Sequence, residues 1–272
     1  MDAIDVRNLS YAYEDRNVLE NLTFNVKEGE LTSILGPNGA GKTTLFLNLV
    51  GILRGRGIIK LFGKDIREYD RRELSKTINM VFQNPDDQLF MPTVLDDIAF
   101  GLINLGYNDV EKRVDKILKR FELEDLRDRY PHHLSFGEKK KVAIASVVSM
   151  NPRILLLDEP TANLDPVSRD ELIKIIEDLN RDGMTILIAT HDTELALKSD
   201  RVMILNRKII KEGTPKEIFS DLSLLRKNGL DTPQIVRLFI ELGLEIPTNM
   251  EEAVKIIKNY LNIGPTSSKP CL

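Results

Sequence analysis

A glycine-rich run that contains one lysine offers the clearest chemistry in this sequence. The run GPNGAGKTT, residues 36–44, matches the pattern G-x-x-x-x-G-K-[ST] and lies between an apolar run and an apolar helical pattern. Glycines let backbone N–H groups turn inward around phosphate oxygens, and the start of the helix adds the positive end of its dipole. Lys42 would reach the β- and γ-phosphates of a nucleotide, and the Thr43 hydroxyl would ligate Mg²⁺. The expected phosphate and metal contacts are Gly36, Asn38, Gly39, Gly41, Lys42, Thr43 and Thr44.

Two carboxylates follow a second apolar run. Residues 154–157 are all apolar, and Asp158 and Glu159 come directly after them. A buried strand would deliver both side chains to the carboxyl edge of a sheet, where α/β proteins bind ligands. Asp158 would hold Mg²⁺, directly or through water. Because phosphoryl transfer to water needs no covalent chemistry from the protein, Glu159 would orient the attacking water and accept its proton.

Short apolar runs alternate with helical patterns along most of the chain. Several runs are almost wholly apolar, which is typical of strands that helices cover on both faces. This alternation predicts an α/β protein with a largely parallel sheet. Between Thr93 and Met150 the strand signal stops and charged, helix-forming residues dominate, which predicts a helical insertion between two strands. The predicted strands are residues 31–35, 78–82, 153–158, 184–189 and 202–206.

Further short motifs follow in order along the chain. They are LSYAYE around Tyr13, Gln83 after the predicted strand 78–82, LSFGE at residues 134–138, ANLD at residues 162–165 and THD around His191. With the glycine-rich run and the two carboxylates, they make roughly residues 1–215 resemble the ATP-binding subunit of an ABC transporter.

The resemblance implies an ATPase that uses ATP and Mg²⁺. It implies a P-loop NTPase core with a mostly parallel sheet, an antiparallel β subdomain, the helical insertion and a small C-terminal helical appendage. The nucleotide-binding domain would comprise residues 1–218, with a helical subdomain at about residues 86–150, and the appendage would comprise residues 219–272.

The resemblance also implies roles for single residues. Tyr13 would stack on adenine, with Tyr11 as the neighbouring alternative, because any purine ring offers a π-face. Gln83 would reach Mg²⁺ and the catalytic water through a side-chain amide. His191 would hydrogen-bond the γ-phosphate and steady Glu159. The implied catalytic residues are Glu159, His191 and Gln83, and the implied metal ligands are Thr43, Gln83 and Asp158.

The run LSFGE resembles the ABC signature, usually written LSGGQ. Ser135 and Glu138 form a Ser-x-x-Glu capping box, so a helix would start here with free N–H groups that attract an anion. In the family this anion is the γ-phosphate of ATP on the opposite subunit, so a second ABC ATPase subunit, identical or related, would complete the site at Ser135 and Gly137. Phe136 replaces the first glycine and Glu138 the usual glutamine. Asp165 resembles the D-loop residue and is also placed to cap a helix.

After residue 213, helix-capping patterns dominate. Residues 214–217 combine a threonine cap, a proline at the first helical position and a glutamate at the third, and residues 248–251 repeat the Thr-x-x-Glu box. Apolar residues then recur at helical spacing until Gly264-Pro265 stops the pattern. Their face would fold back on its own domain or pack against a second subunit. These residues are Ala253, Ile256, Ile257 and Tyr260.

The composition bears on partners and location. Thirty-eight Lys and Arg against 42 Asp and Glu give a net charge of −4, which offers no general attraction to nucleic acid. Apolar runs stay far short of the roughly 20 residues that span a bilayer, and the acidic start of the chain is unlike a secretion signal. Cys271 stands next to the last residue, where it makes neither an internal disulfide nor a prenylation box. We expect a chain that neither spans a membrane nor is exported.

Two stretches of sequence indicate which subgroup of ABC ATPases the chain resembles. Residues 81–101, VFQNPDDQLFMPTVLDDIAFG, and the tail from Gly229 are similar to the energy-coupling-factor and cobalt-type import ATPases. This implies uptake of a cobalt or nickel ion, or of a vitamin. The region from Gln83 to Gly101 would lie at a groove that receives a membrane partner, and the tail would be a dimer contact. The subunit would be peripheral, on the cytoplasmic face of the cell membrane, with integral membrane transport subunits as partners.

Two other classes of protein use a related nucleotide site. A soluble ABC ATPase that acts on nucleic acid or the ribosome shares the motifs, but such chains typically insert long coiled coils or join two cassettes. This sequence shows neither feature, and we expect no nucleic-acid partner. A P-loop kinase or GTPase would lack the signature and the histidine switch.

Overall fold

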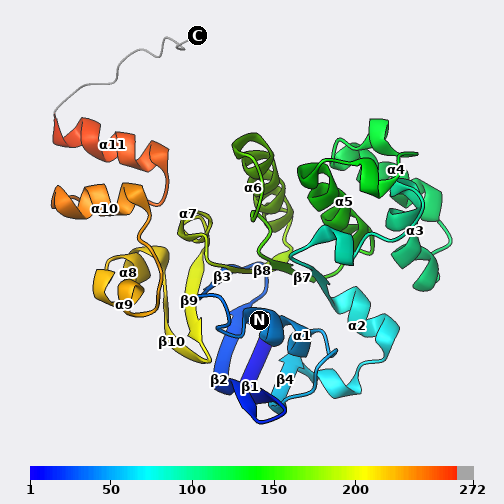
Figure 1. Ribbon diagram of the computed structural model, residues 1–272, viewed down its shortest axis with the longest axis horizontal. Coiled ribbons are helices and arrows are strands. Elements are labelled where there is room, and N and C mark those ends of the chain that lie inside the picture. The colour runs from blue at the N-terminus through cyan, green and yellow to red at the C-terminus, as the bar shows by residue number, and fades with distance from the viewer. Residues whose placement is uncertain (262–272) are drawn as a thin grey trace, which may run out of the picture.

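The computed structural model describes residues 1–261. Figure 1 shows the sheets at the centre of the molecule, the helical insertion on one side and the C-terminal helices on the other. Gly264, Pro265 and Cys271, which the sequence analysis singled out, lie outside the described residues.

The larger sheet has six strands in the order β10-β9-β3-β8-β7-β6, and all its neighbours are parallel except β9 and β10. The strands β3, β7 and β8 are buried along their whole length, which explains their apolar sequences. All the predicted strands are confirmed, with ends that differ by one residue at most. The strands are β3 Leu31–Leu35, β6 Ile78–Val81, β7 Ile154–Asp158, β8 Thr185–Thr190, β9 Arg201–Asn206 and β10 Lys208–Gly213.

The smaller sheet is antiparallel and has the order β2-β1-β4-β5. Helix α1, Lys42–Leu49, lies between the two sheets, and its Phe46 shares a buried cluster with Leu187 of β8. The apolar helical pattern after the phosphate loop continues to Ile52 in the sequence, but Gly51, with a φ of 75°, turns the chain after the helix, so Ile52 is exposed. The strands are β1 Asp2–Tyr13, β2 Arg16–Lys27, β4 Arg56–Leu61 and β5 Lys64–Asp65.

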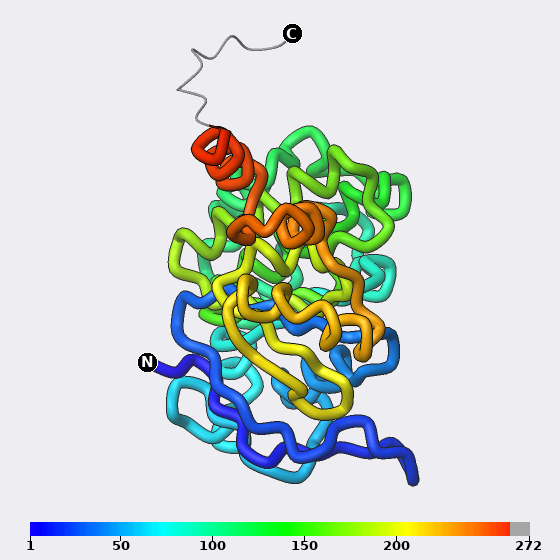
Figure 2. Tube along the Cα trace, turned by 90° about the vertical axis from the view of Figure 1, so that its left-hand side faces the viewer, coloured from blue at the N-terminus to red at the C-terminus, as the bar shows by residue number. Residues whose placement is uncertain are grey.

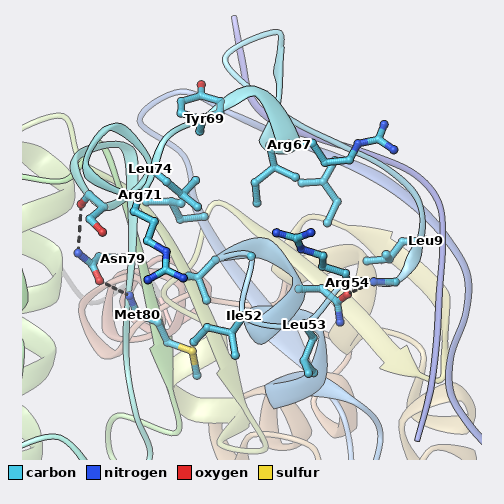
Figure 3. A pocket seen from close by; sticks show the side chains of 18 of the residues that line it. Leu9, Ile52, Leu53, Arg54, Arg67, Tyr69, Arg71, Leu74, Asn79 and Met80 are labelled. Carbon is cyan, nitrogen blue, oxygen red and sulfur yellow. Dashed lines mark hydrogen bonds between the residues drawn. The ribbon is translucent and has the colours of Figure 1, made fainter. Parts of the chain in front are cut away.

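A cavity of about 800 Å³ opens beside the end of α1 (Figure 3). Arg54 and Arg71 extend into it, and α2, Arg71–Thr77, forms one wall. Phe82 also lines this cavity, and the chain then continues into Gln83. The cavity therefore adjoins the segment that connects the parallel sheet to the helical insertion.

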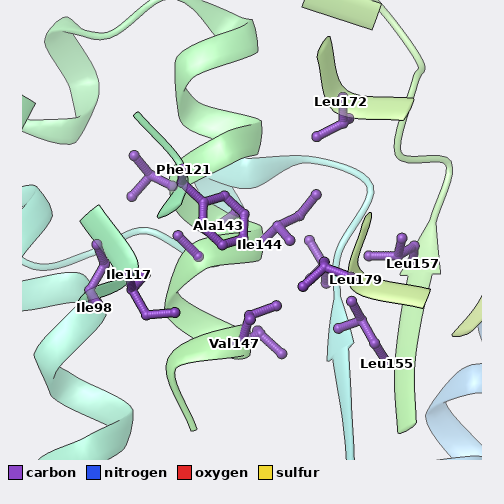
Figure 4. Close-up of a cluster of buried hydrophobic side chains, with 14 of the residues drawn as sticks. Ile98, Ile117, Phe121, Ala143, Ile144, Val147, Leu155, Leu157, Leu172 and Leu179 are labelled. Carbon is purple, nitrogen blue, oxygen red and sulfur yellow. The ribbon is translucent and has the colours of Figure 1, made fainter. Parts of the chain in front are cut away.

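The insertion predicted between Thr93 and Met150 is confirmed as helical. Figure 4 shows Ile98 and Ile117 packed beside α5, and Ile144 of α5 beside Leu155 of β7. This cluster continues into α6, so the insertion shares its core with one face of the parallel sheet. A rigid core of this kind fixes the start of α5 relative to the sheet. The helices are α3 Val94–Asn104, α4 Val110–Arg120, α5 Phe136–Ser149, α6 Pro166–Arg181 and α7 Thr193–Ala196, with short 3-10 turns at Ile66–Glu68, Pro85–Asp87, Glu124–Leu126 and Pro131–His133.

The C-terminal helices pack on their own chain. Phe219 and Val236 share a buried cluster with Leu35 of β3 and Ile204 of β9. Figure 2 looks at these helices, with α11 and the hairpin of β1 and β2 at opposite ends of the view. Exposed apolar side chains remain on α10 and α11, at Leu238, Leu242, Val254 and Tyr260. The helices are α8 Pro215–Phe219, α9 Leu222–Lys227, α10 Gln234–Glu241 and α11 Met250–Tyr260.

Of the two capping boxes predicted in this region, one is confirmed and one is wrong. Thr214 and Glu217 form the expected reciprocal box at the start of α8. At α11 the cap is Asn249, whose side chain accepts from the backbone N–H of Glu252, so the predicted box of residues 248–251 is out of register by one residue. Thr248 instead donates its backbone N–H and its hydroxyl to the Glu252 carboxylate.

Between residues 1 and 261, no helix has both the length and the apolar character that crossing a membrane requires.

Candidate functional site

The glycine-rich run, residues 36–44, forms the loop between β3 and α1. Gly36 packs so closely on β9 that a Cβ there would lie 2.3 Å from the carbonyl oxygen of Leu205. Gly39 and Gly41 have φ angles of 79° and 101°, in the region where a side chain is strained. These positions therefore need glycine for reasons of backbone geometry, independent of any ligand.

Lys42, at the first position of α1, points back into this loop. Its Nζ donates to the carbonyl oxygen of Gly36 at 2.6 Å and lies 3.3 Å from Oε1 of Glu159. The side chains of Lys42 and Glu159 are each only 7% exposed. A buried ammonium is stable only while oxygen atoms surround it, so the oxygens of a phosphate could replace these partners.

A cavity of about 400 Å³ opens in front of the loop, at the carboxyl edge of the parallel sheet. Almost all the residues that the sequence assigned to one nucleotide site meet here. They are Tyr13, Asn38, Gly39, Gly41, Lys42, Thr43, Thr44, Gln83, Asp158 and Glu159. Arg16 and Val18 also line the cavity, and sequence reasoning did not single them out.

Thr43 and Asp158 meet at the floor of the site. The Thr43 hydroxyl donates to Oδ2 of Asp158 at 2.6 Å. Burial raises the pKa of Asp158, and the nearby Glu159 adds to this, while the Thr43 hydrogen bond opposes it. A hydroxyl, a carboxylate and the amide of Gln83 are hard oxygen donors that suit Mg²⁺.

Across residues 1–261, no group of three or more His, Cys, Asp or Glu side chains could hold a metal ion by themselves. Mg²⁺ is usually bound through one or two carboxylates together with substrate phosphates. Thr43 and Asp158 are therefore suited to hold a cation that binds together with a nucleotide.

Glu159 is fixed by several hydrogen bonds just after the end of β7. Its φ is 45°, a left-handed conformation that is uncommon outside glycine, and its backbone N–H donates to Ala189 at 2.8 Å. Oε2 accepts from the Thr190 hydroxyl at 2.9 Å, and Oε1 lies 2.9 Å from Nδ1 of His191. The structure thus brings His191 to Glu159, and it adds Thr190, the first residue of the THD motif, to which the sequence analysis gave no role.

Tyr13 and Tyr11 differ in their surroundings. Tyr13 lines the cavity and is 44% exposed, so its ring is accessible to a ligand. Tyr11 packs against the buried cluster between the sheets and meets Tyr13 edge to face, with 4.9 Å between ring centroids. Of the two alternatives, Tyr13 is the one whose side chain lines the cavity.

The signature residues lie apart from this cavity in the same chain. Ser135 caps α5 by accepting from the backbone N–H of Glu138, and the Glu138 carboxylate accepts from Ser135 N–H at 2.7 Å. Burial raises the pKa of Glu138, but its bonds to Ser135 more than offset this and lower it overall. Ser135, Gly137 and Asp165 are not among the residues that line the nucleotide cavity of their own chain.

Gly137 and Asp165 belong to one contact between α5 and α6. Asp165 caps α6 by accepting from the backbone N–H groups of Val167 and Ser168, each at 3.0 Å. A Cβ at Gly137 would lie 2.6 Å from Oγ of Ser168. The glycine in the signature therefore lets α5 approach α6 within one chain, whatever it contacts in a partner.

Lys140 is the main residue of this region that sequence reasoning missed. It lies on α5 with none of its surface exposed, and its Nζ donates to the backbone carbonyls of Gln83 and Glu159. Burial lowers the pKa of Lys140 to about 8, although Asp158 and Glu159 act in the other direction. Within a run of three lysines, the pattern alone gives no sign that one of them is buried.

Comparison with known proteins gives one consistent family. The family model described as ABC transporter matches residues 19–162. The chain is 49% identical, over 96% of its length and 99% of the relative, to the energy-coupling factor transporter ATP-binding protein EcfA of Methanocaldococcus jannaschii. It is 45% identical, over 95% of its length and 98% of the relative, to the protein of the same name from Carboxydothermus hydrogenoformans.

Solved structures agree with this. The chain superposes on cbiO1 of Clostridium perfringens, described as part of the ABC transporter complex cbiONQ, with a TM-score of 0.74 and 40% identity over 89% of this chain and 99% of the other. A dimeric ATP-binding cassette bound to ADP and phosphate, in a post-hydrolysis state, matches with a TM-score of 0.69 and 28% identity over 78% of this chain and 98% of the other. The phosphate loop, the paired carboxylates and these matches agree, and the chain belongs to the ABC transporter family as an ATP-hydrolysing, nucleotide-binding subunit.

Proposed function

We propose that this chain powers the import of a small solute, a cobalt or nickel ion or a vitamin, through a complex of integral membrane subunits. The observation that carries the proposal is a cavity lined by the phosphate loop, Asp158, Glu159 and Gln83 in a chain that is 44–49% identical, along almost its whole length, to energy-coupling factor transporter ATP-binding proteins. The chain would be peripheral, on the cytoplasmic face of the membrane. The name of cbiO1 as part of a transporter complex supports membrane partners.

In the proposed mechanism the residues of one chain bind ATP and prepare a water. Lys42 leaves the carbonyl of Gly36 and binds phosphate oxygens, and Tyr13 stacks on the base. Thr43, Asp158 and Gln83 would hold Mg²⁺, which when bound supplies positive charge to the phosphate oxygens. Glu159 takes the proton of the attacking water, and His191, at 2.9 Å from its Oε1, keeps that carboxylate in position.

A second ABC ATPase subunit completes the site in this proposal. Ser135 is exposed at the start of α5 and Gly137 lies buried two residues later, both outside the cavity of their own chain, so this helix start would meet ATP that is bound to the partner. Asp165 lies at the neighbouring start of α6. Because the γ-phosphate joins both surfaces and ADP does not, hydrolysis would separate the subunits. Dimeric cassettes among the solved relatives support this step.

The surface after Gln83 suits a membrane partner. Phe90 is 65% exposed and Phe100 is 41% exposed, and their rings meet edge to face at 4.9 Å between centroids. Ile103, on the same helix as Phe100, is exposed as well. We propose that a helix of an integral subunit covers these apolar side chains. A shift of Gln83 would then be transmitted to the membrane subunits through the residues that follow it in the chain.

The exposed faces of α10 and α11 offer a second contact. Leu238, Leu242 and Val254 are 44–53% exposed, although Phe219 and Val236 of the same region share a buried cluster with β9. We propose that residues 219–272 form an appendage whose outer face contacts the other ATPase subunit, while its inner face packs on its own cassette.

Recovery of the intact complex tests the proposed function. The tagged chain should be isolated from gently solubilised membranes, and its integral partners and any bound metal or vitamin identified by mass spectrometry. We expect a double variant, Phe90→Asp with Phe100→Asp, to lose the membrane partners while its own ATPase activity persists. Ile210→Asp, at a similarly exposed apolar position on β10, is the control and should retain them.

Two results would contradict the proposal. A wild-type chain recovered without any integral partner would argue against transport, and recovery with ribosomes or nucleic acid would favour the soluble class of ABC ATPase. Vesicles that contain the recovered complex should take up the identified solute only when ATP is on the side of this chain.

A further inference from the structure

Lys140 connects segments that are far apart in the sequence. It lies on α5, one turn after the signature residues, and its side chain has no exposed surface. Its Nζ donates to the backbone carbonyl of Gln83, which follows β6, and to that of Glu159, which follows β7, at 3.2 Å for the latter. One ammonium group therefore joins the signature helix to the backbones of two residues of the proposed hydrolytic site.

We propose that Lys140 is a positioning residue for ATP hydrolysis, which holds the backbones of Gln83 and Glu159 in register with the start of the signature helix. Both acceptors are main-chain oxygens, so the ammonium leaves the Gln83 amide and the Glu159 carboxylate available for water and metal. The proposal rests on the roles proposed above for those two side chains.

The backbone of Glu159 shows why such a bond matters. Its φ of 45° is maintained by the surrounding structure, because a residue with a Cβ rarely adopts it unaided. Its N–H is bound by Ala189 of the neighbouring strand, and its carbonyl is bound by Lys140. The same carbonyl also accepts from the backbone N–H of Ala162 at 3.3 Å, so loss of the Lys140 bond would loosen the peptide after Glu159 without freeing it, and the carboxylate would be held less firmly towards the water.

Phe136, one of the two residues that depart from the usual signature, lies next to this ammonium. It lies one helical turn before Lys140 on the same face of α5, and the ammonium is 5.8 Å from the centroid of its ring. An aromatic face attracts a cation and excludes water from it. The substitution of glycine by phenylalanine therefore helps to enclose the ammonium, and we include Phe136 in the positioning unit.

Steady-state kinetics of the full-length chain test this inference. We expect Lys140→Met to lower kcat for ATP by about tenfold or more, the size expected for loss of a hydrogen bond to a charged group, while KM for ATP changes by less than about threefold. Lys140→Gln keeps N–H donors without the charge and should recover most of kcat. Lys141→Met is the matched control, since Lys141 pairs with the exposed Glu171 outside the site, and it should resemble wild type.

The outcomes separate this inference from the proposed function. If Glu159→Gln is inactive but Lys140→Met hydrolyses ATP at the wild-type rate, the positioning role is wrong and the hydrolytic site stands. If Glu159→Gln retains wild-type activity, the proposed site itself is wrong. A Lys140→Met variant whose KM rises with kcat unchanged would show a role in nucleotide affinity and would also overturn the inference. If Lys140→Met fails to fold, Lys140→Gln and Lys140→Arg provide the test, provided that both fold and bind ATP. Equal loss of activity in these two variants would overturn the positioning role of Lys140.

Discussion

At the scale of single residues, the candidate site pairs two buried carboxylates with two buried ammonium groups. The carboxylates of Asp158 and Glu159 lie next to the ammonium groups of Lys42 and Lys140, and all four residues are buried. Removal of one partner from such a group leaves an uncompensated buried charge, which is strongly destabilising. An isosteric change from carboxylate to amide is therefore a safer probe than truncation.

Glu159→Gln tests the proposed base. We expect kcat for ATP hydrolysis to fall by about 100-fold or more, since general base catalysis contributes roughly 10²–10⁴-fold. ATP binding should persist, because the phosphate loop and Lys42 are unchanged, and the closed dimer should accumulate. Phosphate release, equilibrium dialysis with ATP and size-exclusion chromatography measure these effects. Glu171→Gln, an exposed change on α6, is the control, and near-normal turnover by Glu159→Gln would exclude the assignment.

Tyr13→Ala tests the stacking contact. Base stacking on an aromatic ring contributes about 1–3 kcal/mol in nucleic-acid systems, so we expect the Kd for ATP to rise by about tenfold. Tyr13→Phe keeps the ring and should bind ATP like wild type. Inorganic tripolyphosphate has no base, so its Kd should be equal for all of these variants. If Tyr13→Ala weakened tripolyphosphate as much as ATP, the ring would support the loop and not the base.

At the scale of elements, the sequence predicts those features that depend on residues close together in the chain. Strand ends, the phosphate loop, the cap at Ser135 and the cap at Asp165 all follow from short-range patterns, and the structure agrees with them. The cap of α11 was misplaced because Asn249 stands beside Thr248 and Glu252 beside Glu251, so two registers satisfy the same rule. Only the fold chooses between them.

Long-range contacts explain what the sequence did not predict. Lys140 binds carbonyls that are 57 and 19 residues away, and Thr190 binds Glu159 from 31 residues away. Neither contact leaves a periodic signal, because each depends on how whole strands and helices pack. The motifs thus predicted most of the residues that line one cavity, whereas the residues that hold its backbone needed the structure.

The position of α11 depends on one carboxylate. Glu252 accepts two hydrogen bonds from Thr248 and one from Lys216 of α8, and these bonds lower its pKa to about 2. Since this pKa lies below its ordinary value, the ionised carboxylate stabilises the folded helix above about pH 4.5. That contribution is lost as the pH falls from about 4.5 towards 2.

We therefore expect α11 to detach from α8 as acid is added over this pH window. Amide NMR signals of residues 250–260 should move towards disordered values at low pH. Glu252→Gln should loosen α11 already at pH 6, by on the order of 1 kcal/mol, because a neutral amide accepts these bonds more weakly. Glu251→Gln, which removes the same charge one residue earlier, is the control. Unchanged α11 signals in Glu252→Gln would show that apolar packing alone holds the helix.

At the scale of the whole molecule, the two halves of the proposed catalytic site lie on different surfaces. Lys42 and Glu159 line the cavity at the sheet edge, while Ser135 belongs to the start of α5, outside that cavity. A single chain can therefore bind ATP on one surface and present its signature on another. Two such chains related by a twofold axis, with the cavity of each facing the signature of the other, would form two complete sites.

Mixing two inactive variants tests this arrangement. Lys42→Ala removes the phosphate contact, and Ser135→Arg blocks the signature surface, so each variant alone should hydrolyse ATP very slowly. In an equal mixture about half of the dimers contain one of each, and each mixed dimer has one intact site, which should restore about a quarter of the wild-type rate. The activity should also fall on dilution as dimers dissociate. A mixture that stays inactive at every ratio would rule out a site shared between two copies of this chain, whereas full wild-type activity in dilute, monomeric Ser135→Arg would place the whole reaction within one cassette.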